Sequence, residues 1–170
     1  SLVFGVGSGL LRLGWNFPLP SANLAVFHGP LMVCGFLGTV ISLERAVAIG
    51  QRWAYLGPLS AALGGLVIIA GLPWPNGAGL ITVASIILSV ASAIIFLRQR
   101  TLFILILLLG SLSWLFGNFL WITGFNIPQV APWWIGFLVL TIAGERLELS
   151  RLMPPSPNSI IIFVVIIVLL

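Results

Sequence analysis

The stretch FHGPLMVCGFLGTVISLERAVAIG, residues 27–50, determines the fold class of this chain. Residues 27–43 contain neither an arginine nor an acidic residue, and Glu44 and Arg45 then follow side by side. A helix needs about 20 largely apolar residues to cross the hydrocarbon core of a bilayer. The stretch therefore predicts a membrane-spanning helix that reaches charged residues at one membrane surface.

The rest of the chain has the same character. Of its 170 residues, 60% are hydrophobic and only 6% are charged, whereas a water-soluble protein of this size would need a charged surface. The apolar runs also lack the alternating segments of roughly 10 residues that are typical of a transmembrane β-barrel. We therefore expect an all-α, polytopic transmembrane helical bundle whose main partner is the lipid bilayer.

The apolar runs predict about six spans plus a truncated seventh. The chain opens on Ser1 without an initiator methionine, and its last apolar run, residues 160–170, has about half the length of a crossing. We expect from this a fragment of a longer protein. The predicted elements are a partial first helix that ends near residue 15, spans at 22–45, 54–72, 78–98, 101–124 and 128–149, and a seventh begun at 160.

The arginines predict how the chain is oriented. All but Arg12 fall in or beside the same alternate set of connections, and the positive-inside rule places that side in the cytoplasm. The opposite connections are rich in tryptophan, as at the outer interface of an inner (plasma) membrane. Because the arginines form no continuous patch, no nucleic-acid partner is expected. The cytoplasmic set is Arg45, Arg52, Arg98, Arg100, Arg146 and Arg151.

Part of the sequence recurs. Gly-Phe-Leu and Glu-Arg at residues 35–37 and 44–45 return at 136–138 and 145–146, and residues 7–18 resemble residues 117–128. The copies lie four crossings apart, which predicts a parallel four-helix internal repeat, with a first unit at 1–100 and a second beginning at 101–170. The alternative is a chance resemblance between spans rich in small and apolar residues.

The repeated Glu-Arg pairs suggest a structural interlock at the cytoplasmic ends of two spans. Neighbours in a helix point to different faces, so we expect Glu44 to pair with Arg146, and Glu145 with Arg45, across the two units. A proton relay is the alternative, but it needs further ionisable groups toward the middle of the membrane, and this stretch of sequence has none.

His28, the single histidine, is the first candidate for function. At α-helical spacing it shares a small and polar stripe with Met32, Gly35, Thr39 and Ser42, which should face other helices. A neutral imidazole is a good axial ligand for haem iron, so His28 is the candidate cofactor and metal ligand. The alternative is a histidine that is hydrogen-bonded to a neighbouring helix.

Arg12 is the second candidate, because it lies on the side of the membrane that arginine usually avoids. An arginine there needs an anion, and the propionates of a haem bound to His28 would lie at about that depth. Snorkelling to lipid phosphate or to water is the alternative. No catalytic motif occurs in the chain, so no catalytic residue is assigned, and Cys34 is expected to be a small core residue.

The histidine stretch resembles the corresponding spans of the NnrS family, which are haem- and copper-associated membrane proteins linked to nitric oxide responses. A parallel four-helix repeat with a histidine in its second helix is also similar to the catalytic subunit of haem-copper oxidases. These resemblances imply haem b, with His28 as its axial ligand. No second histidine occurs, so they do not extend to a haem-copper binuclear centre.

Three classes of function remain open at this point. A haem-binding protein with a redox or gas-related role, for NO or O₂, is the first. A cofactor-free accessory or structural subunit of a larger respiratory or photosynthetic membrane complex is the second, and it implies other membrane subunits as partners. A small-solute transporter comes third, because the predicted spans carry no charge near the middle of the membrane.

Overall fold

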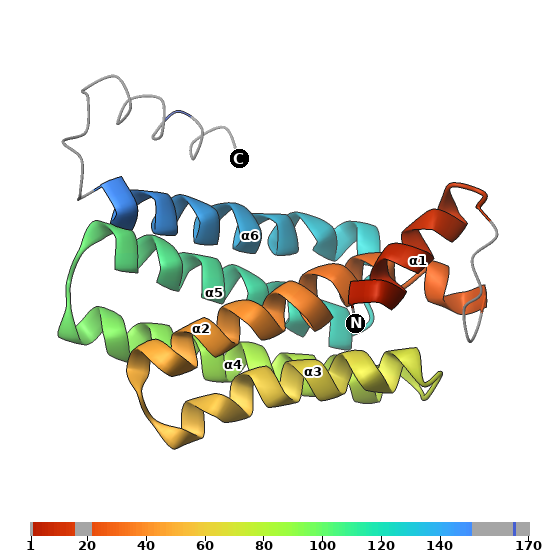
Figure 1. Cartoon of the computed structure of the whole chain (residues 1–170), viewed down its shortest axis with the longest axis horizontal. Helices are drawn as coiled ribbons and strands as arrows, with labels where there is room; N and C mark the ends of the chain where they lie inside the picture. The colour runs from red at the N-terminus through yellow and green to blue at the C-terminus, as the bar shows by residue number, and fades with distance from the viewer. Residues whose placement is uncertain (1, 16–21, 151–164, 166–170) are drawn as a thin grey trace.

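The computed structural model describes residues 2–15, 22–150 and 165, and every regular element in this part of the chain is a helix. Figure 1 shows the long helices lying side by side in one bundle. The expected all-α class is confirmed. The elements are α1 (Leu2–Arg12), η1 (Ala22–Ala25), η2 (Pro30–Leu37), α2 (Gly38–Ile49), η3 (Arg52–Tyr55), α3 (Leu56–Ile69), α4 (Trp74–Arg98), α5 (Leu102–Ile122) and α6 (Ile127–Ser150).

Five helical stretches among the described residues are long and apolar enough to cross a membrane. They correspond to the second to sixth predicted spans, with ends displaced by a few residues, as expected for a multi-pass membrane protein. With 11 residues, α1 is too short for a crossing. The seventh span predicted from residue 160 lies outside the described residues. The five stretches are Pro30–Ile49, Arg52–Ile69, Trp74–Arg98, Leu102–Ile122 and Ile127–Ser150.

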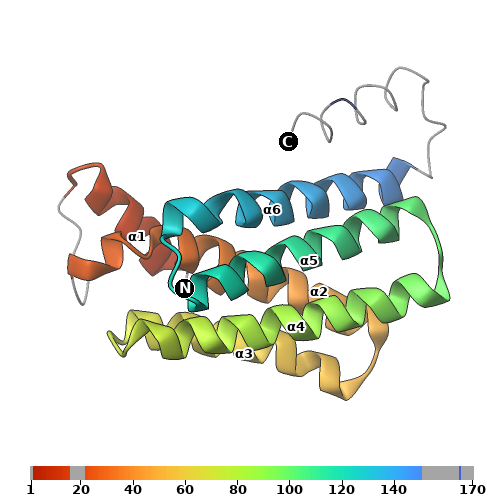
Figure 2. The ribbon, with the colours of Figure 1, turned by 180° about the vertical axis from the view of Figure 1, so that it is seen from behind.

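The helices pack in chain order around a shared core. Helix α6 lies beside α5, α5 beside α4, α4 beside α3, and α3 beside η2 and α2, while α6 also reaches η2. In Figure 2 the same neighbours are seen from behind. Helix α1 packs against η2 at one end of this arrangement.

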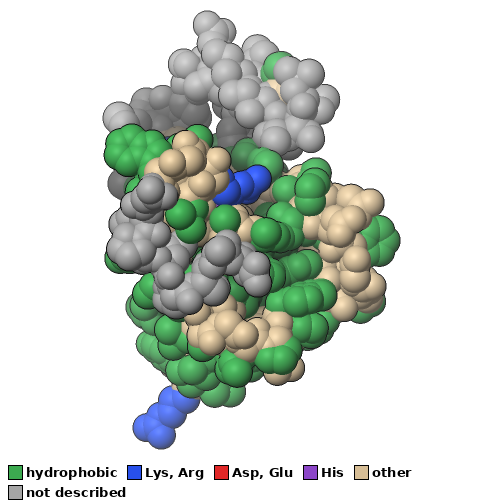
Figure 3. Space-filling model, turned by 90° about the vertical axis from the view of Figure 1, so that its right-hand side faces the viewer, with side chains coloured by type: hydrophobic (Ala, Val, Ile, Leu, Met, Phe, Trp, Pro, Cys, Tyr) green, Lys and Arg blue, Asp and Glu red, His purple; other side chains and the backbone are tan. Residues whose placement is uncertain are grey.

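Large aromatic side chains fill the centre of the bundle. Trp114, Trp134 and Phe137 are fully buried, and the rings of Trp114 and Phe137 are stacked with centroids 5.0 Å apart. Figure 3 looks onto the end of the bundle at which α1 lies, and hydrophobic side chains make up much of the described surface there. Many leucines and valines are also exposed along the outside of the helices. Such an exterior suits lipid contact.

The two ends of the bundle differ in chemistry. The connections at 50–51 and 99–101 form the arginine end, which carries Arg45, Arg52, Arg98, Arg100 and Arg146. The connections at 70–73 and 123–126 form the tryptophan end, where α1 also lies (Figure 1). These five arginines therefore lie at one end of the bundle, as the sequence predicts.

Turns at the tryptophan end share one geometry. Gly14, Gly71 and Gly124 all have positive φ, at 83°, 72° and 102°, and each follows the end of a helix. In each turn the residue after the glycine donates a backbone hydrogen bond to the carbonyl five residues back, as in a Schellman cap. The sequences are GWNFP (14–18), GLPWP (71–75) and GFNIP (124–128).

This turn motif bears on the predicted repeat. Matches between residues 14–18 and 124–128 contributed to that prediction, but a third turn at 71–75 follows the same pattern outside the repeat. Helix capping therefore explains this part of the resemblance by itself. The Glu-Arg copies also differ, because Arg45 is 8% exposed whereas Arg146 is exposed. Duplication stays a prediction.

Residues 30–37 form a π-helix, η2, which the sequence reasoning did not anticipate. Pro30 stands at its start and has no backbone N–H, so one regular helical hydrogen bond is missing there. A π-helix has wider turns than an α-helix, and such segments occur frequently at functional sites. The expected stripe from His28 to Ser42 assumes regular α-helical spacing, which the π-helix changes, although His28 and Met32 still both contact α1.

Candidate functional site

His28 lies just before η2 and faces α1. Its Nδ1 atom is 2.7 Å from the backbone carbonyl oxygen of Gly5. A carbonyl can only accept a hydrogen bond, so a neutral imidazole must carry its proton on Nδ1 and leave the lone pair on Nε2. The hydrogen bond to a neighbouring helix, which the sequence offered as an alternative, is therefore present, and it also determines which nitrogen is available to a metal.

Glycines on α1 make room for the imidazole. A Cβ atom on Gly9 would lie 2.8 Å from Cε1 of His28 and 3.0 Å from Nδ1, closer than packed atoms approach. A Cβ atom on Gly5 would likewise lie 2.6 Å from Sδ of Met32. Gly9 therefore leaves room for the His28 ring, and Gly5 leaves room for the side chain of Met32 beside it.

The acceptor carbonyl is itself held in place. Ser8 is fully buried, and its hydroxyl donates to the same Gly5 oxygen at 2.8 Å. Two side-chain donors, one from α1 and one from the segment before η2, therefore converge on one backbone oxygen. Together they fix the orientation of the imidazole relative to α1, as outer hydrogen bonds do for metal-binding histidines.

Arg12, the other predicted cofactor contact, is the last residue of α1 and is exposed. Gly5, Gly9 and Arg12 are spaced at i, i+4 and i+7, which places them along one face of a helix. The face that meets His28 therefore continues to Arg12. The structure thus places the two predicted residues at the same end of the bundle, with Arg12 at the end of the helix that contacts His28.

No group of three or more His, Cys, Asp or Glu residues that could hold a metal ion occurs among the described residues. A bare transition-metal ion needs several protein ligands, whereas haem iron needs only one or two. Within the described residues, His28 is therefore not part of a multi-residue metal site of that kind.

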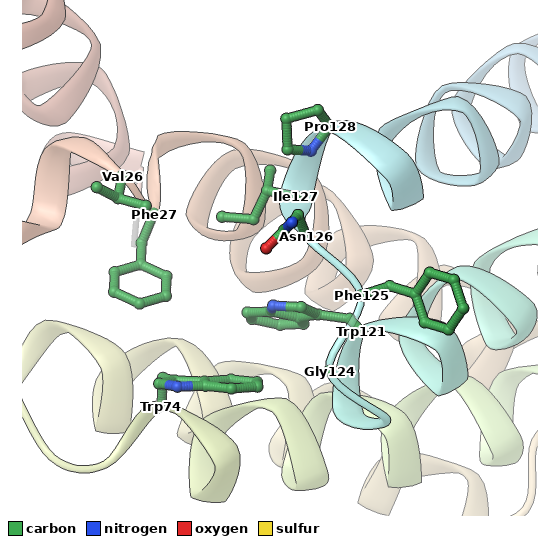
Figure 4. A pocket seen from close by; sticks show the side chains of 9 residues that line it. All are labelled: Val26, Phe27, Trp74, Trp121, Gly124, Phe125, Asn126, Ile127 and Pro128. Carbon is green, nitrogen blue, oxygen red and sulfur yellow. The ribbon is translucent and has the colours of Figure 1, made fainter.

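An aromatic cavity of about 470 Å³ opens at the tryptophan end (Figure 4). Figure 4 shows the Trp121 indole over that of Trp74, with Phe27 across the cavity from them. The stacked rings have centroids 5.8 Å apart, and Trp121 also meets Trp134 edge to face at 5.4 Å. His28 is next to Phe27 in the chain but does not line this cavity.

Sequence reasoning did not find this aromatic cavity. Trp74 and Trp121 are 47 positions apart, and a membrane interface gives sufficient reason for tryptophan at the end of a helix. Their stacking depends on how α4 packs against α5, which single-sequence patterns do not specify.

A polar chain crosses the middle of the core. The indole N–H of Trp114 donates to Sγ of Cys34 at 3.4 Å, the thiol donates to Oδ1 of Asn118 at 3.5 Å, and Trp134 donates to the same oxygen at 3.0 Å. All four side chains are buried. Cys34 is thus a core residue, and it links η2 to α5 and through Asn118 to α6.

Three of the four predicted interlock residues, Glu44, Arg45 and Glu145, lie near one another at the arginine end. Nη2 of Arg45 lies 3.7 Å from Oε1 of Glu44, its neighbour in the chain, a pairing that the sequence argument had disfavoured. The long arginine side chain can reach back along its own helix, which the argument from Cα directions neglected. Glu145 interacts electrostatically with both Glu44 and Arg45, whereas Arg146 is exposed.

Comparison with known proteins gives a family for this chain. No curated protein and no solved structure gives a significant match to it. One family profile, described as a domain of unknown function (DUF8744), matches residues 1–170. The match covers the whole sequence, so the chain belongs to the family DUF8744.

Proposed function

We propose that this protein binds haem b through Nε2 of His28 and serves in electron transfer or in handling NO or O₂ within a membrane. The observation that carries the proposal is the hydrogen bond from His28 Nδ1 to the Gly5 carbonyl, at 2.7 Å. It fixes the tautomer in which Nε2 keeps its lone pair, and it holds the ring in one orientation.

The surroundings of His28 support the same reading. No hydrogen bond to Nε2 is formed within the described residues, and Nε2 is not among their buried unpaired polar atoms, so it is open to a ligand. Arg12 lies further along the α1 face that meets His28, where its guanidinium can bind the carboxylate of a propionate. The sequence resemblance to the NnrS family points to the same cofactor.

Haem with one protein ligand supplies a one-electron redox couple and an iron atom that can bind a diatomic gas. The residues of this chain would orient the group: His28 through the Gly5 hydrogen bond, and Arg12 through charge. The apolar exterior and the closely packed core would keep water away from the ring.

The decisive experiment compares His28→Gln with wild type in detergent-extracted protein from cells supplied with a haem precursor. Glutamine can still donate a hydrogen bond to the Gly5 carbonyl, but it is a poor iron ligand. We expect a Soret band and a reduced-minus-oxidised difference spectrum in the wild type, and neither in His28→Gln. The thermal unfolding of the two proteins should be similar, which separates ligation from folding.

Two controls complete that experiment. Met32→Leu replaces the only other soft donor one turn away on the same contact with α1, and it should keep the Soret band. His28→Gly should recover the band when imidazole is added. A band that survives in His28→Gln would contradict His28 as the axial ligand. A wild-type protein without a band when haem is plentiful would contradict haem binding and favour the cofactor-free membrane subunit.

We further propose that the arginine end faces the cytoplasm of a cell whose inner (plasma) membrane holds the protein. Support comes from five arginines at that end against Arg12 at the tryptophan end, in the sense of the positive-inside rule. The His28 site would then lie near the outer surface.

A further inference from the structure

The arginine end contains a cavity of about 240 Å³ that has no part in the proposed haem site. It lies where α2, α4, α5 and α6 come together. Its polar lining is Arg45, Arg98, Gln99 and Glu148, and the remaining walls are apolar, including Ile49 and Phe103. Arg98 is the last residue of α4, so the cavity sits at the level where a helix leaves the hydrocarbon.

Arg45 is the unusual member of this cavity. The residue is 8% exposed, and its Nη2 atom makes no hydrogen bond within the described residues. The Glu44 carboxylate oxygen, at 3.7 Å, contributes charge but lies beyond hydrogen-bonding distance. Arg45 also lines the cavity, so an anionic group that enters it would meet the positive charge of a largely buried guanidinium.

The charges that line the cavity indicate what kind of acceptor fits. Arg45 and Arg98 contribute two positive charges and Glu148 one negative charge, which leaves a net charge of +1. Glu44 and Glu145 lie near Arg45 but do not line the cavity. A singly charged phosphodiester complements this balance, because arginine binds phosphate oxygens through paired donors. Glu148 can accept a hydrogen bond from a hydroxyl group on the same ligand.

We propose that this cavity binds the headgroup of an anionic phospholipid of the phosphatidylglycerol type. The phosphate contacts Arg45 and Arg98, and the glycerol hydroxyls face Glu148. The apolar walls accept the start of the acyl chains, which continue along the lipid-facing surface. Basic pockets between membrane helices are suited to such headgroups. The ligand is a lipid and not free phosphate, because more than half of the lining residues are apolar.

The test uses thermal unfolding of the purified full chain in a zwitterionic detergent, followed by tryptophan fluorescence. Dihexanoyl phosphatidylglycerol is titrated into wild type, Arg98→Gln and Arg45→Gln, with dihexanoyl phosphatidylcholine and inorganic phosphate as parallel titrants. We expect saturable stabilisation by phosphatidylglycerol only. Loss of one charged hydrogen bond to phosphate should weaken the apparent affinity about tenfold in Arg98→Gln.

Arg52→Gln is the matched control, because Arg52 is exposed at the same end but does not line the cavity. Its affinity for phosphatidylglycerol should equal that of wild type. Arg98 is also exposed, so Arg98→Gln should fold and can carry the test if the buried Arg45→Gln does not. Equal stabilisation by phosphatidylcholine or by inorganic phosphate, or an equal effect of Arg52→Gln and Arg98→Gln, would overturn the proposal.

Discussion

Single glycines determine how closely α1 approaches the rest of the molecule. Gly9 touches the His28 ring, and Gly5 supplies the carbonyl that accepts its hydrogen bond. The site therefore depends on the absence of a side chain as much as on the histidine itself. Substitutions at these glycines separate the packing of α1 from the chemistry of the imidazole.

Gly9→Ala should displace the His28 ring, because the new Cβ atom would lie 2.8 Å from Cε1. Overpacking of this kind lowers the free energy of unfolding by about 1–3 kcal/mol, and loss of the hydrogen bond to Gly5 lowers it further. We expect a lower unfolding temperature in detergent. Gly29→Ala is the control, since its Cβ atom would meet the nearest atom, on Ile127, at an ordinary 4.0 Å. Equal unfolding temperatures for the two variants would contradict the packing described here.

At the residue scale, the sequence indicated side chains that donate hydrogen bonds better than the groups that accept them. His28 and Arg12 stood out because they are rare residue types in an apolar chain. The partner of His28 is a backbone carbonyl, which has no signature in the sequence. The burial of Arg45 and the exposure of Arg146 were equally unpredictable, because the two arginines follow the same Glu-Arg pattern and only packing distinguishes them.

Helix pairs owe their spacing to small residues at the crossing points. In α3 and α4, a Cβ atom on Gly64 would lie 2.8 Å from the backbone oxygen of Gly77, and one on Gly77 would lie 2.9 Å from the oxygen of Gly64. The two backbones are thus in direct contact. Close approach of this kind is a main source of helix association inside membranes, where apolar side chains gain little from leaving lipid.

Gly64→Ala should therefore separate α3 from α4, because a backbone atom cannot move aside as a flexible side chain can. We expect a loss of stability of about 1–3 kcal/mol, measured by unfolding in mixed micelles. Gly79→Ala, also on α4, is the comparison: its Cβ atom would have 3.8 Å to Ile122, and alanine favours a helix by up to about 1 kcal/mol over glycine. If Gly64→Ala were as stable as Gly79→Ala, the backbone contact between α3 and α4 would contribute nothing to stability.

Element boundaries followed the sequence more closely than element geometry did. Glycine and proline mark the turns at 71–75 and 124–128, so the predicted ends near these turns were nearly right. The π-helix at 30–37 was missed, since Pro30 in an apolar run is also compatible with a kinked α-helix. The sequence also did not indicate which face of each helix is buried, because these helices are apolar on all sides.

The molecule as a whole has a closed interior and an apolar exterior. Cys34, at the centre of the polar chain, has no exposed surface. It is also the single cysteine in the sequence. Its thiol can therefore report on the opening of the bundle as a whole.

We expect Cys34 to resist a small membrane-permeable maleimide in the folded protein and to react fully after unfolding in SDS. Mass spectrometry of the intact chain measures the labelled fraction. Asn118→Ala removes the acceptor of both the Cys34 thiol and the Trp134 indole, and should raise the labelling rate of the folded protein. Rapid labelling of wild type without SDS would show that the core opens far more readily than its burial indicates.

The proposed orientation is tested with two introduced cysteines in a Cys34→Ala background. Gln51→Cys lies at the arginine end and Asn126→Cys at the tryptophan end, and both positions are exposed. A membrane-impermeant maleimide added to intact cells should label Asn126→Cys, and should label Gln51→Cys only after the cells are permeabilised. The reverse pattern would place the arginine end outside and contradict the positive-inside assignment.

The short capped turns at 70–73 and 123–126 have a consequence for biosynthesis. Each joins two long helices that pack against each other, α3 with α4 and α5 with α6, and each is specified by a few neighbouring residues. Pairing within such a hairpin closes only a small loop, so its entropic cost is low. Each hairpin can form as soon as it emerges from the ribosome and can enter the membrane from the translocon as a paired unit. The segment that contains His28 then packs against the two hairpins.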